Sequence, residues 1–97
     1  MKKLKIGIVG CGAIGSSLAK EIVANLHSSA ILAAIYDIRP EKAQALAKLL
    51  EKSAKLCAGN LDALIKKSDL VIEASSAKAA WLIAQKSLSR QRKVMIM

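Results

Sequence analysis

The segment from Gly10 to Gly15, which reads Gly-Cys-Gly-Ala-Ile-Gly, carries the clearest chemical signal in this 97-residue chain. It follows an apolar run, residues 6–9, and precedes a run with helical spacing. A strand, a glycine-rich bend and the first turn of a helix, in this order, form a pocket for a pyrophosphate. The free N–H groups and the dipole of the helix favour a negative charge there. Small-residue bends are common, so this pattern by itself is a weak indication.

Each of the three glycines has a separate role in this hypothesis. Gly10 permits a tight turn, Gly12 lets a diphosphate come close to the backbone, and Gly15 lets the helix lie close to the strand. A second feature supports it, because Asp37 ends the next apolar run, residues 31–36, about twenty residues beyond the last glycine. A carboxylate at this distance is typical of domains in which it binds the adenosine ribose. The two features together predict a site for a dinucleotide.

The residues around Asp37 bear on which dinucleotide is bound. The negative charge of Asp37 would repel a 2′-phosphate, which favours NAD over NADP. Ile38 directly follows Asp37, and Arg39 stands one position further on. The Arg39 guanidinium could pair with a phosphate, or it could be a solvated side chain where a helix begins. The sequence therefore predicts NAD as the cofactor and leaves the use of NADP open.

A second set of candidate residues ends the apolar run 69–74. Ala74 and Ser75 are small, so the nicotinamide half of a dinucleotide could pass over them, and the Ser75 hydroxyl could bind a ribose. Glu73 is unusual in such an apolar run. It either reaches solvent at the end of the strand or has a functional role. Ser76 is expected to cap the next helix.

No group of residues elsewhere suits acid–base catalysis or metal binding. The single histidine, His27, falls at the end of a predicted helix, remote from the glycine bend. The two cysteines, Cys11 and Cys57, lack the spacing of a zinc site, and we expect no disulfide between them. Cys11 is interpreted as a small packing residue, with a redox-sensitive thiol as the alternative. We therefore predict no catalytic residue and no metal site.

The charge balance is strongly basic, with 16 Lys and Arg residues against 7 Asp and Glu residues. A basic domain can bind nucleic acid, but Tyr36 and Trp81 are the only aromatic residues and no nucleic-acid motif is present. We interpret the lysines as a solvated surface that also attracts an anionic cofactor. No apolar run approaches the ~20 residues that span a bilayer, and the start of the chain does not fit a signal peptide. We expect a cytoplasmic protein with no membrane or nucleic-acid partner.

Strand and helix patterns alternate along the chain, which predicts an α/β domain with a doubly wound parallel sheet of the Rossmann type. Numbered along the chain, the five expected strands should lie in the order 3-2-1-4-5, with the ligand cleft beyond the carboxyl ends of strands one and four. The expected strands are residues 5–9, 31–36, 55–58, 69–74 and 93–97, and the first and last helices cover residues 13–27 and 77–88. The inward faces predicted for these two helices are Ile14, Leu18, Ile22 and Leu26 in the first, and Ala77, Trp81, Ala84 and Leu88 in the last.

Four segments resemble the amino end of the L-aspartate dehydrogenase family, namely residues 6–16, 36–43, 69–75 and 93–97. Taken singly, these motifs also resemble homoserine dehydrogenase and dihydrodipicolinate reductase, but their combination is more narrowly similar to aspartate dehydrogenase. The resemblance implies the cofactor domain of an enzyme that oxidises L-aspartate to iminoaspartate with NAD or NADP, in NAD biosynthesis. By resemblance, the diphosphate would be held by Gly10, Gly12, Ala13, Ile14 and Gly15, the adenosine ribose by Asp37, and the nicotinamide side by Ala74 and Ser75.

The resemblance stops after the fifth predicted strand. Members of the family continue into a second domain that supplies the catalytic histidine, the aspartate site and most of the dimer contacts. We therefore expect residues 1–97 to form one dinucleotide-binding domain, truncated after strand five and without the catalytic domain. We expect it to be inactive unless a C-terminal segment or chain completes it. Because strand five would then be an exposed edge, we also expect self-association as a dimer.

Two other functions stay open at this point. The chain could be a free-standing module that binds or senses a dinucleotide without catalysis. It could also be a methyltransferase-like domain, because domains that bind S-adenosylmethionine share a glycine-rich first turn and an acidic second strand. The Cys-Gly-Ala-Ile-Gly turn and its spacing favour the dinucleotide.

Overall fold

The computed structural model describes residues 2–97 of the chain. Strands and helices alternate, and all strand pairs are parallel. Within residues 2–97, no helix has both the length and the apolar character needed to cross a membrane. The elements in chain order are β1 (Leu4–Val9), α1 (Ala13–Asn25), β2 (Ala30–Tyr36), α2 (Pro40–Leu49), the 3-10 helix η1 (Ala54–Leu56), α3 (Leu61–Lys67), β3 (Leu70–Glu73), α4 (Ala77–Ser89) and β4 (Lys93–Ile96).

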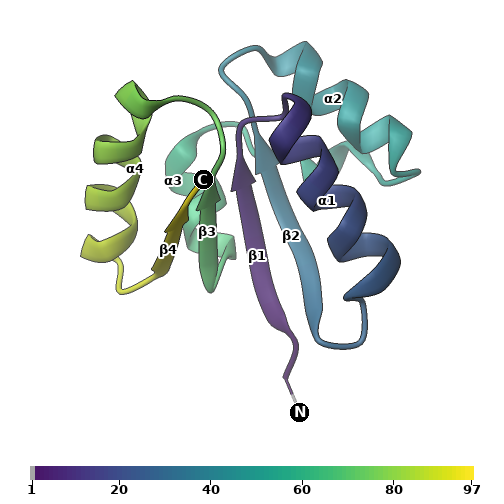
Figure 1. Ribbon diagram of the computed structural model, residues 1–97, viewed down its shortest axis with the longest axis horizontal. Helices are drawn as coiled ribbons and strands as arrows, with labels where there is room; N and C mark the ends of the chain where they lie inside the picture. Colours follow the sequence, from purple (N-terminus) through teal and green to yellow (C-terminus); the bar gives the residue numbers. More distant parts are fainter. Residues whose placement is uncertain (1) are drawn as a thin grey trace.

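The four strands form one sheet in the order β2-β1-β3-β4 (Figure 1). The first strand is central, with β2 on one side and β3 on the other. Its last residue, Val9, is level with Tyr36 at the end of β2 and with Glu73 at the end of β3. Because the strands are parallel, their carboxyl ends meet at one edge. This confirms the expected Rossmann-like α/β fold and brings three of the segments singled out in the sequence together.

The strand expected at residues 55–58 does not form. Its first part is the short helix η1, which begins at Ser53, whose side chain accepts the N–H of Lys55 at 3.1 Å. Only Cys57 reaches the edge of β2, where it makes a single bridge with Ile35. The expected order 3-2-1-4-5 is therefore corrected. The third expected strand is reduced to one bridge, and the other four strands keep their expected places as β2-β1-β3-β4. The local hydroxyl contact favours a helical turn over a strand in so short a segment.

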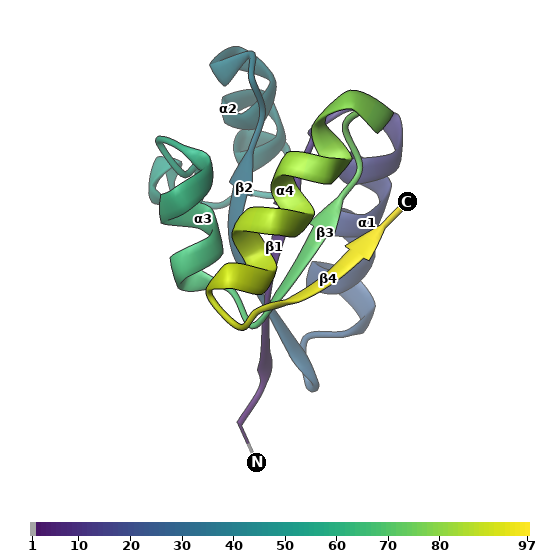
Figure 2. The same ribbon diagram turned by 90° about the vertical axis from the view of Figure 1, so that its left-hand side faces the viewer.

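Two layers of helices cover the sheet, with α1 and α2 on one face and α3 and α4 on the other (Figures 1 and 2). Each layer buries small or aliphatic side chains against the strands, so the hydrophobic effect holds both layers to the sheet. The buried helical side chains are Ala19, Ile22, Ala43, Leu46 and Ala47 on the first face, and Leu64, Ile65 and Ile83 on the second.

The inward face predicted for α1 is partly wrong. Ile14 is 55% exposed and Leu26 lies beyond the end of the helix, whereas Gly15, Ala19 and Ile22 are buried. A strict repeat of four residues advances about 40° per step beyond a full turn, so Ile14 and Leu26, three steps apart, lie about 120° from each other around the helix axis and cannot both face the sheet.

The inward face predicted for α4 is also wrong. Trp81 is 72% exposed and Leu88 is exposed, while Ile83 and Ser87 are buried. Apolar residues occur almost all round this helix, so their spacing does not single out a face. Packing against α3 and the sheet selects the face with Ile83. Ala77 was also predicted on the inward face, but its side chain is not among those that the structure describes.

Candidate functional site

The chain turns sharply as it leaves β1. Gly10 has a φ of +100°, a conformation that residues with a side chain rarely adopt. Its N–H donates to the carbonyl oxygen of Tyr36 at 2.8 Å. A Cβ on Gly10 would lie 2.7 Å from the backbone nitrogen of Ser75. The bend after β1 therefore packs directly against the chain that leaves β3, and only a glycine fits between them.

Helix α1 begins immediately after this bend, and its N-terminus is open. Its N-cap residue is Gly12, no side chain caps it by a hydrogen bond, and its first turn contains no acidic residue. A Cβ on Gly12 would meet nothing within 4 Å. The first N–H groups of the helix lack intrahelical partners, and the helix dipole places a partial positive charge there. This end of α1 can therefore receive an anionic group close to the backbone.

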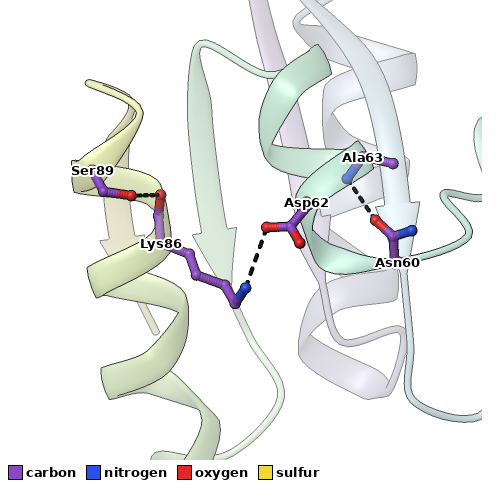
Figure 3. Close-up of polar contacts among 5 residues, drawn as sticks. All are labelled: Asn60, Asp62, Ala63, Lys86 and Ser89. Atoms are coloured by element: carbon purple, nitrogen blue, oxygen red, sulfur yellow. Dashed lines mark hydrogen bonds and ion pairs between the residues drawn. The ribbon is translucent and has the colours of Figure 1, made fainter.

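The other three α-helices described begin at the same edge of the sheet (Figure 1), but each N-terminus carries an accepting or acidic side chain. The Asn60 side chain caps α3, and Asp62 lies in the first turn of that helix (Figure 3). Helix α2 has Glu41 in its first turn, and Ser76 caps α4. Hydrogen-bonding side chains cap α3 and α4, and Glu41 places a negative charge at the uncapped start of α2, so α1 is the end best suited to a diphosphate.

The first turn of α1 is held tightly against the bend. A Cβ on Gly15 would overlap the carbonyl oxygen of Gly10, so a larger residue would push the helix away. The Ser16 hydroxyl donates to the carbonyl oxygen of Cys11 at 3.1 Å. Ser16 is a residue that sequence reasoning missed, and its place directly after the third glycine was the available signal. Together these contacts fix the position of the N–H groups of the helix.

Asp37, just beyond the end of β2, is bonded to the bend. Its Oδ2 accepts the N–H of Cys11 at 2.8 Å, and its Oδ1 accepts the N–H of Arg39 at 2.9 Å. A carboxylate offers about four acceptor positions, so each oxygen keeps capacity for a further hydrogen bond. A sugar hydroxyl next to an anion at the bend would lie beside this carboxylate.

The side chain of Cys11 points into the interior rather than into the site. The thiol is buried, and the pKa of Cys11 is raised to about 12, mainly by burial and secondarily by the nearby charge of Asp37. The Sγ donates to the carbonyl oxygen of Tyr36 at 3.7 Å. Burial also raises the pKa of Cys57, and both cysteines are free. These facts favour the packing interpretation of Cys11 over a redox-sensitive thiol.

An apolar cleft of about 260 Å³ lies between the end of β2 and helix α4. Gly10 and Asp37 line it at one side, and Leu82 and Ile83 line it at the other. Ile38 lines the same cleft and is 85% exposed, so its aliphatic surface is available to a flat ring. This cleft can accept an apolar, planar group attached to a sugar at Asp37.

A second cleft, of about 270 Å³, lies on the other side of residues 74–76. Ala74 and Ser75 line it together with Ile14 of α1 and Met97 beyond β4. Ser75 also lines the first cleft. Residues 74–76 thus form a ridge between two clefts, and the bend after β1 lies against this ridge.

Glu73 lies beneath the ridge. It is 2% exposed, and its Oε1 accepts the N–H of Ser75 at 2.7 Å and the N–H of Ser76 at 3.2 Å. The Ser75 hydroxyl donates to the same oxygen. Of the two interpretations open for Glu73, the one with a solvent-exposed carboxylate is wrong. The carboxylate folds back toward the start of α4 because the backbone N–H groups there have no acceptor within the helix.

Among residues 2–97, no group of three or more His, Cys, Asp and Glu side chains is arranged to hold a metal ion. His27 lies at the opposite edge of the sheet, near Lys3 and Lys52. It is exposed and far from the glycine bend, as its place in the sequence predicts.

A parallel sheet that places a glycine bend, an uncapped helix N-terminus and a carboxylate at one edge defines a dinucleotide-binding domain of the Rossmann type. Residues 10–97 match the model of a family described as the NAD-binding domain of homoserine dehydrogenase. Because this match covers most of the chain, the chain belongs to that family of NAD-binding domains. The predicted cofactor class is thereby confirmed.

The curated relatives are similar to the chain and share one particular activity, which the family description does not give. The chain is 44% identical over 95 residues to an L-aspartate dehydrogenase of Methanocaldococcus jannaschii, covering 97% of this chain and 34% of the relative. It is 41% identical to an L-aspartate dehydrogenase of Methanococcus maripaludis, with the same coverage. The chain therefore spans about a third of the length of these relatives. The resemblance to the amino end of aspartate dehydrogenases is confirmed.

Solved structures support the fold. The myo-inositol dehydrogenase of Lactobacillus casei, in complex with NAD(H) and myo-inositol, superposes with a TM-score of 0.83 at 24% identity. The match covers 98% of this chain and 28% of that chain.

Proposed function

We propose that this chain is the cofactor-binding part of an L-aspartate dehydrogenase, which oxidises L-aspartate to iminoaspartate with NAD in NAD biosynthesis. The observation that carries the proposal is the open N-terminus of α1 at Gly12, beside the carboxylate of Asp37. The likeness to the curated aspartate dehydrogenases supports the choice of reaction.

Each part of NAD has a place in the proposed complex. The adenosine ribose binds Asp37, and the adenine enters the apolar cleft between Ile38 and Leu82. The nicotinamide half crosses the ridge at Ala74 and Ser75 toward the second cleft. The diphosphate lies at the bend and the first turn of α1, which consist of Gly10, Cys11, Gly12, Ala13, Ile14 and Gly15.

NAD is preferred to NADP in this proposal because the Asp37 carboxylate, held by the N–H groups of Cys11 and Arg39, is the group that we expect to bind the ribose. A 2′-phosphate there would meet a like charge at close range. Arg39 is exposed one residue beyond Ile38 and offers a guanidinium that reduces this repulsion. We therefore expect NADP to bind more weakly than NAD and still measurably.

Catalysis needs groups that the described clefts do not supply. When bound, the nicotinamide provides a hydride acceptor, but oxidation of an amine also needs a base and a site for the two carboxylates of aspartate. Asp37 and Glu73 are the acids that line the two clefts, and each already accepts backbone N–H groups. We propose that a further segment, corresponding to the remaining two thirds of the relatives, supplies the aspartate site. Without it the chain would be a binding module.

We also infer that the chain self-associates. The last strand, β4, is an edge of the sheet that pairs with β3 alone. Unpaired strand edges and contiguous apolar surface favour association. The exposed apolar side chains of α4, β4 and the following residue are Trp81, Leu82, Leu88, Met95, Ile96 and Met97. Light scattering on a dilute sample should show dimers or larger species, and a strict monomer would contradict this inference.

Calorimetry with three separate ligands tests the cofactor proposal. We expect NAD to bind, NADP to bind more weakly, and S-adenosylmethionine not to bind. Binding of S-adenosylmethionine alone would overturn the proposal in favour of a methyltransferase-like domain. Absorbance at 340 nm after addition of aspartate and NAD tests catalysis, and we expect no turnover by this chain without a further segment. Robust turnover would contradict the assignment of the aspartate site to that segment.

A further inference from the structure

We propose that Glu73 is a positioning residue for the cofactor site, and that its buried carboxylate holds the ridge at residues 74–76 in the place that lets NAD cross from one cleft to the other. The proposal rests on the proposed binding of NAD and gives a role to Glu73, which borders the second cleft but is only 2% exposed. Glu73 would act through Ser75 and Ser76, which line both clefts.

The carboxylate gathers the donors of the ridge on one oxygen. Oε1 of Glu73 accepts the N–H of Ser75 at 2.7 Å, the N–H of Ser76 at 3.2 Å, and the Ser75 hydroxyl. These are the residues that precede the first turn of α4. One side chain therefore sets both the path of the ridge and the direction in which the Ser75 side chain points.

The ridge has little freedom on its other side. The N–H of Ala74 donates to the carbonyl oxygen of Val9 at 2.8 Å, and a Cβ on Gly10 would contact Ser75 at 2.7 Å. The ridge is thus held between Glu73 below it and the glycine bend beside it. A shift of the ridge toward the bend would narrow the place proposed for the diphosphate, and a shift away would open the apolar cleft.

The burial of this charge is otherwise unexplained. Among the described residues the recorded ion pair joins Lys86 to Asp62, on the surface, and none involves Glu73 (Figure 3). A buried carboxylate without a cation is costly unless hydrogen bonds and dipoles compensate it. Here three donors and the N-terminus of the 13-residue helix α4 do so. The Ser75 and Ser76 donors thus stabilise the buried carboxylate, and the carboxylate in turn fixes the position of these two residues.

Three variants of the chain test the proposal. Glu73→Leu removes the acceptor, Glu73→Gln keeps an oxygen that can accept all three bonds, and Glu21→Gln is a matched control on the exposed surface of α1. Binding of NADH is measured by fluorescence titration, amide hydrogen exchange at Ser75 and Ser76 reports the ridge, and thermal unfolding reports the fold.

We expect Glu73→Leu to weaken NADH binding by about tenfold or more and to accelerate exchange at both amides. Glu73→Gln should restore most of the affinity and slow exchange, and Glu21→Gln should match the parent chain. If Glu73→Leu acted only by lowering the stability of the whole fold, we would not expect Glu73→Gln to restore both the affinity for NADH and the slow exchange at Ser75 and Ser76. Should Glu73→Leu not fold, Glu73→Asp replaces it, because the shorter side chain withdraws the carboxylate from the ridge.

Two results would overturn the proposal. One is a folded Glu73→Leu or Glu73→Asp variant that binds NADH as tightly as the parent chain. The other is unchanged exchange at Ser75 and Ser76 in these variants. If the parent chain itself does not bind NADH, the proposed function fails, and the exchange measurement on the unliganded chain still decides whether Glu73 positions the ridge.

Discussion

The carboxylate of Asp37 accepts a hydrogen bond from the backbone N–H of Cys11, with 2.8 Å between Oδ2 and the nitrogen. The two residues are 26 positions apart in the chain. The bond joins the end of β2 to the bend after β1, so one carboxylate holds the bend and also stands where a ribose would lie. Changes at Asp37 should therefore affect both the choice of cofactor and the shape of the bend.

Replacement of Asp37 by alanine should reduce the preference for NAD over NADP. The variant loses a charged acceptor for the ribose hydroxyls, and hydrogen bonds to charged groups contribute about 1.5–3 kcal/mol. We expect NAD to bind about 10- to 100-fold more weakly. The affinity for NADP should fall less, because the variant also removes the repulsion between the Asp37 carboxylate and the 2′-phosphate. Titration calorimetry with both cofactors measures the ratio.

Asp62→Ala is the matched control for this variant. Asp62 makes an exposed ion pair with Lys86 at 3.3 Å (Figure 3), and neither residue lines the two clefts. It should leave both affinities unchanged and alter the free energy of unfolding by less than about 1 kcal/mol. An Asp37→Ala variant that kept the parent preference for NAD would show that Asp37 does not select the cofactor.

Replacement of Gly12 by alanine should weaken cofactor binding without unfolding the chain. The φ of Gly12 is −79°, which alanine can adopt, and its Cβ would meet nothing within 4 Å. The free energy of unfolding should fall by about 1 kcal/mol or less, since alanine is a poorer N-cap than glycine. NAD should bind about tenfold more weakly or worse, because the methyl group takes the space of the diphosphate.

Gly59→Ala serves as the control, since a Cβ there also meets nothing within 4 Å and Gly59 is outside the glycine bend. Its affinity for NAD should equal that of the parent chain. Equal affinities for all three proteins would place the diphosphate elsewhere.

Replacement of Gly10 by alanine should destabilise the fold itself. The Cβ would lie 2.7–2.8 Å from backbone atoms of Ala74 and Ser75, and the φ of +100° is unfavourable for any side chain. Strain and overpacking together should lower the free energy of unfolding by about 2–4 kcal/mol. Urea denaturation followed by circular dichroism measures the change. A loss below about 1 kcal/mol would mean that the ridge and the bend can separate easily.

The buried thiol of Cys11 should make the fold less stable at alkaline pH. Its pKa is about 12 in the folded chain, against an ordinary value of 9.0 in the unfolded chain. Above pH 9 the unfolded chain therefore releases a proton that the folded chain retains, so the free energy of unfolding falls as the pH rises. Comparison with Cys11→Ala between pH 8 and pH 10 isolates this contribution. Parallel curves for the two proteins would contradict it.

Replacement of Ser87 by alanine should leave the stability unchanged or raise it by about 1 kcal/mol. Ser87 is buried, and its hydroxyl oxygen has no hydrogen-bond partner among the described residues. Ser68→Ala is the matched comparison, because the buried hydroxyl of Ser68 donates to the carbonyl oxygen of Leu64 at 2.7 Å. That variant should lose about 1 kcal/mol. Thermal denaturation of both proteins tests the difference, and a marked loss in Ser87→Ala would reveal a partner for its hydroxyl.

Local features of the site could be predicted from the sequence because neighbouring residues determine them. The segment around Gly10 is an example. It combines a φ that only glycine tolerates with an apolar run before it and a helical run after it. The same holds for the Ser76 cap, which accepts the N–H of Ala79, three residues further on. Ribose recognition by Asp37 was predicted in the same way, from its distance along the chain, and it stays a prediction until a complex is measured.

Features that depend on distant partners could not be predicted in this way. The buried faces of α1 and α4 depend on which helix and strand pack against them, so Ile14 and Trp81 were assigned to the wrong side. The strand expected at residues 55–58 is reduced to one bridge because its pairing with β2 competes with a local turn.

The amino-acid sequence by itself determined the class of this protein, since the alternation of strands and helices and the spacing of three glycines and one aspartate are written along the chain. Only the tertiary structure decided how the site is supported. Glu73 could be recognised as a buried carboxylate beneath the ridge only once β3, α4 and the bend were placed together. The physical reason is that the cost of burying a charge depends on the donors around it, and the fold brings those donors into place.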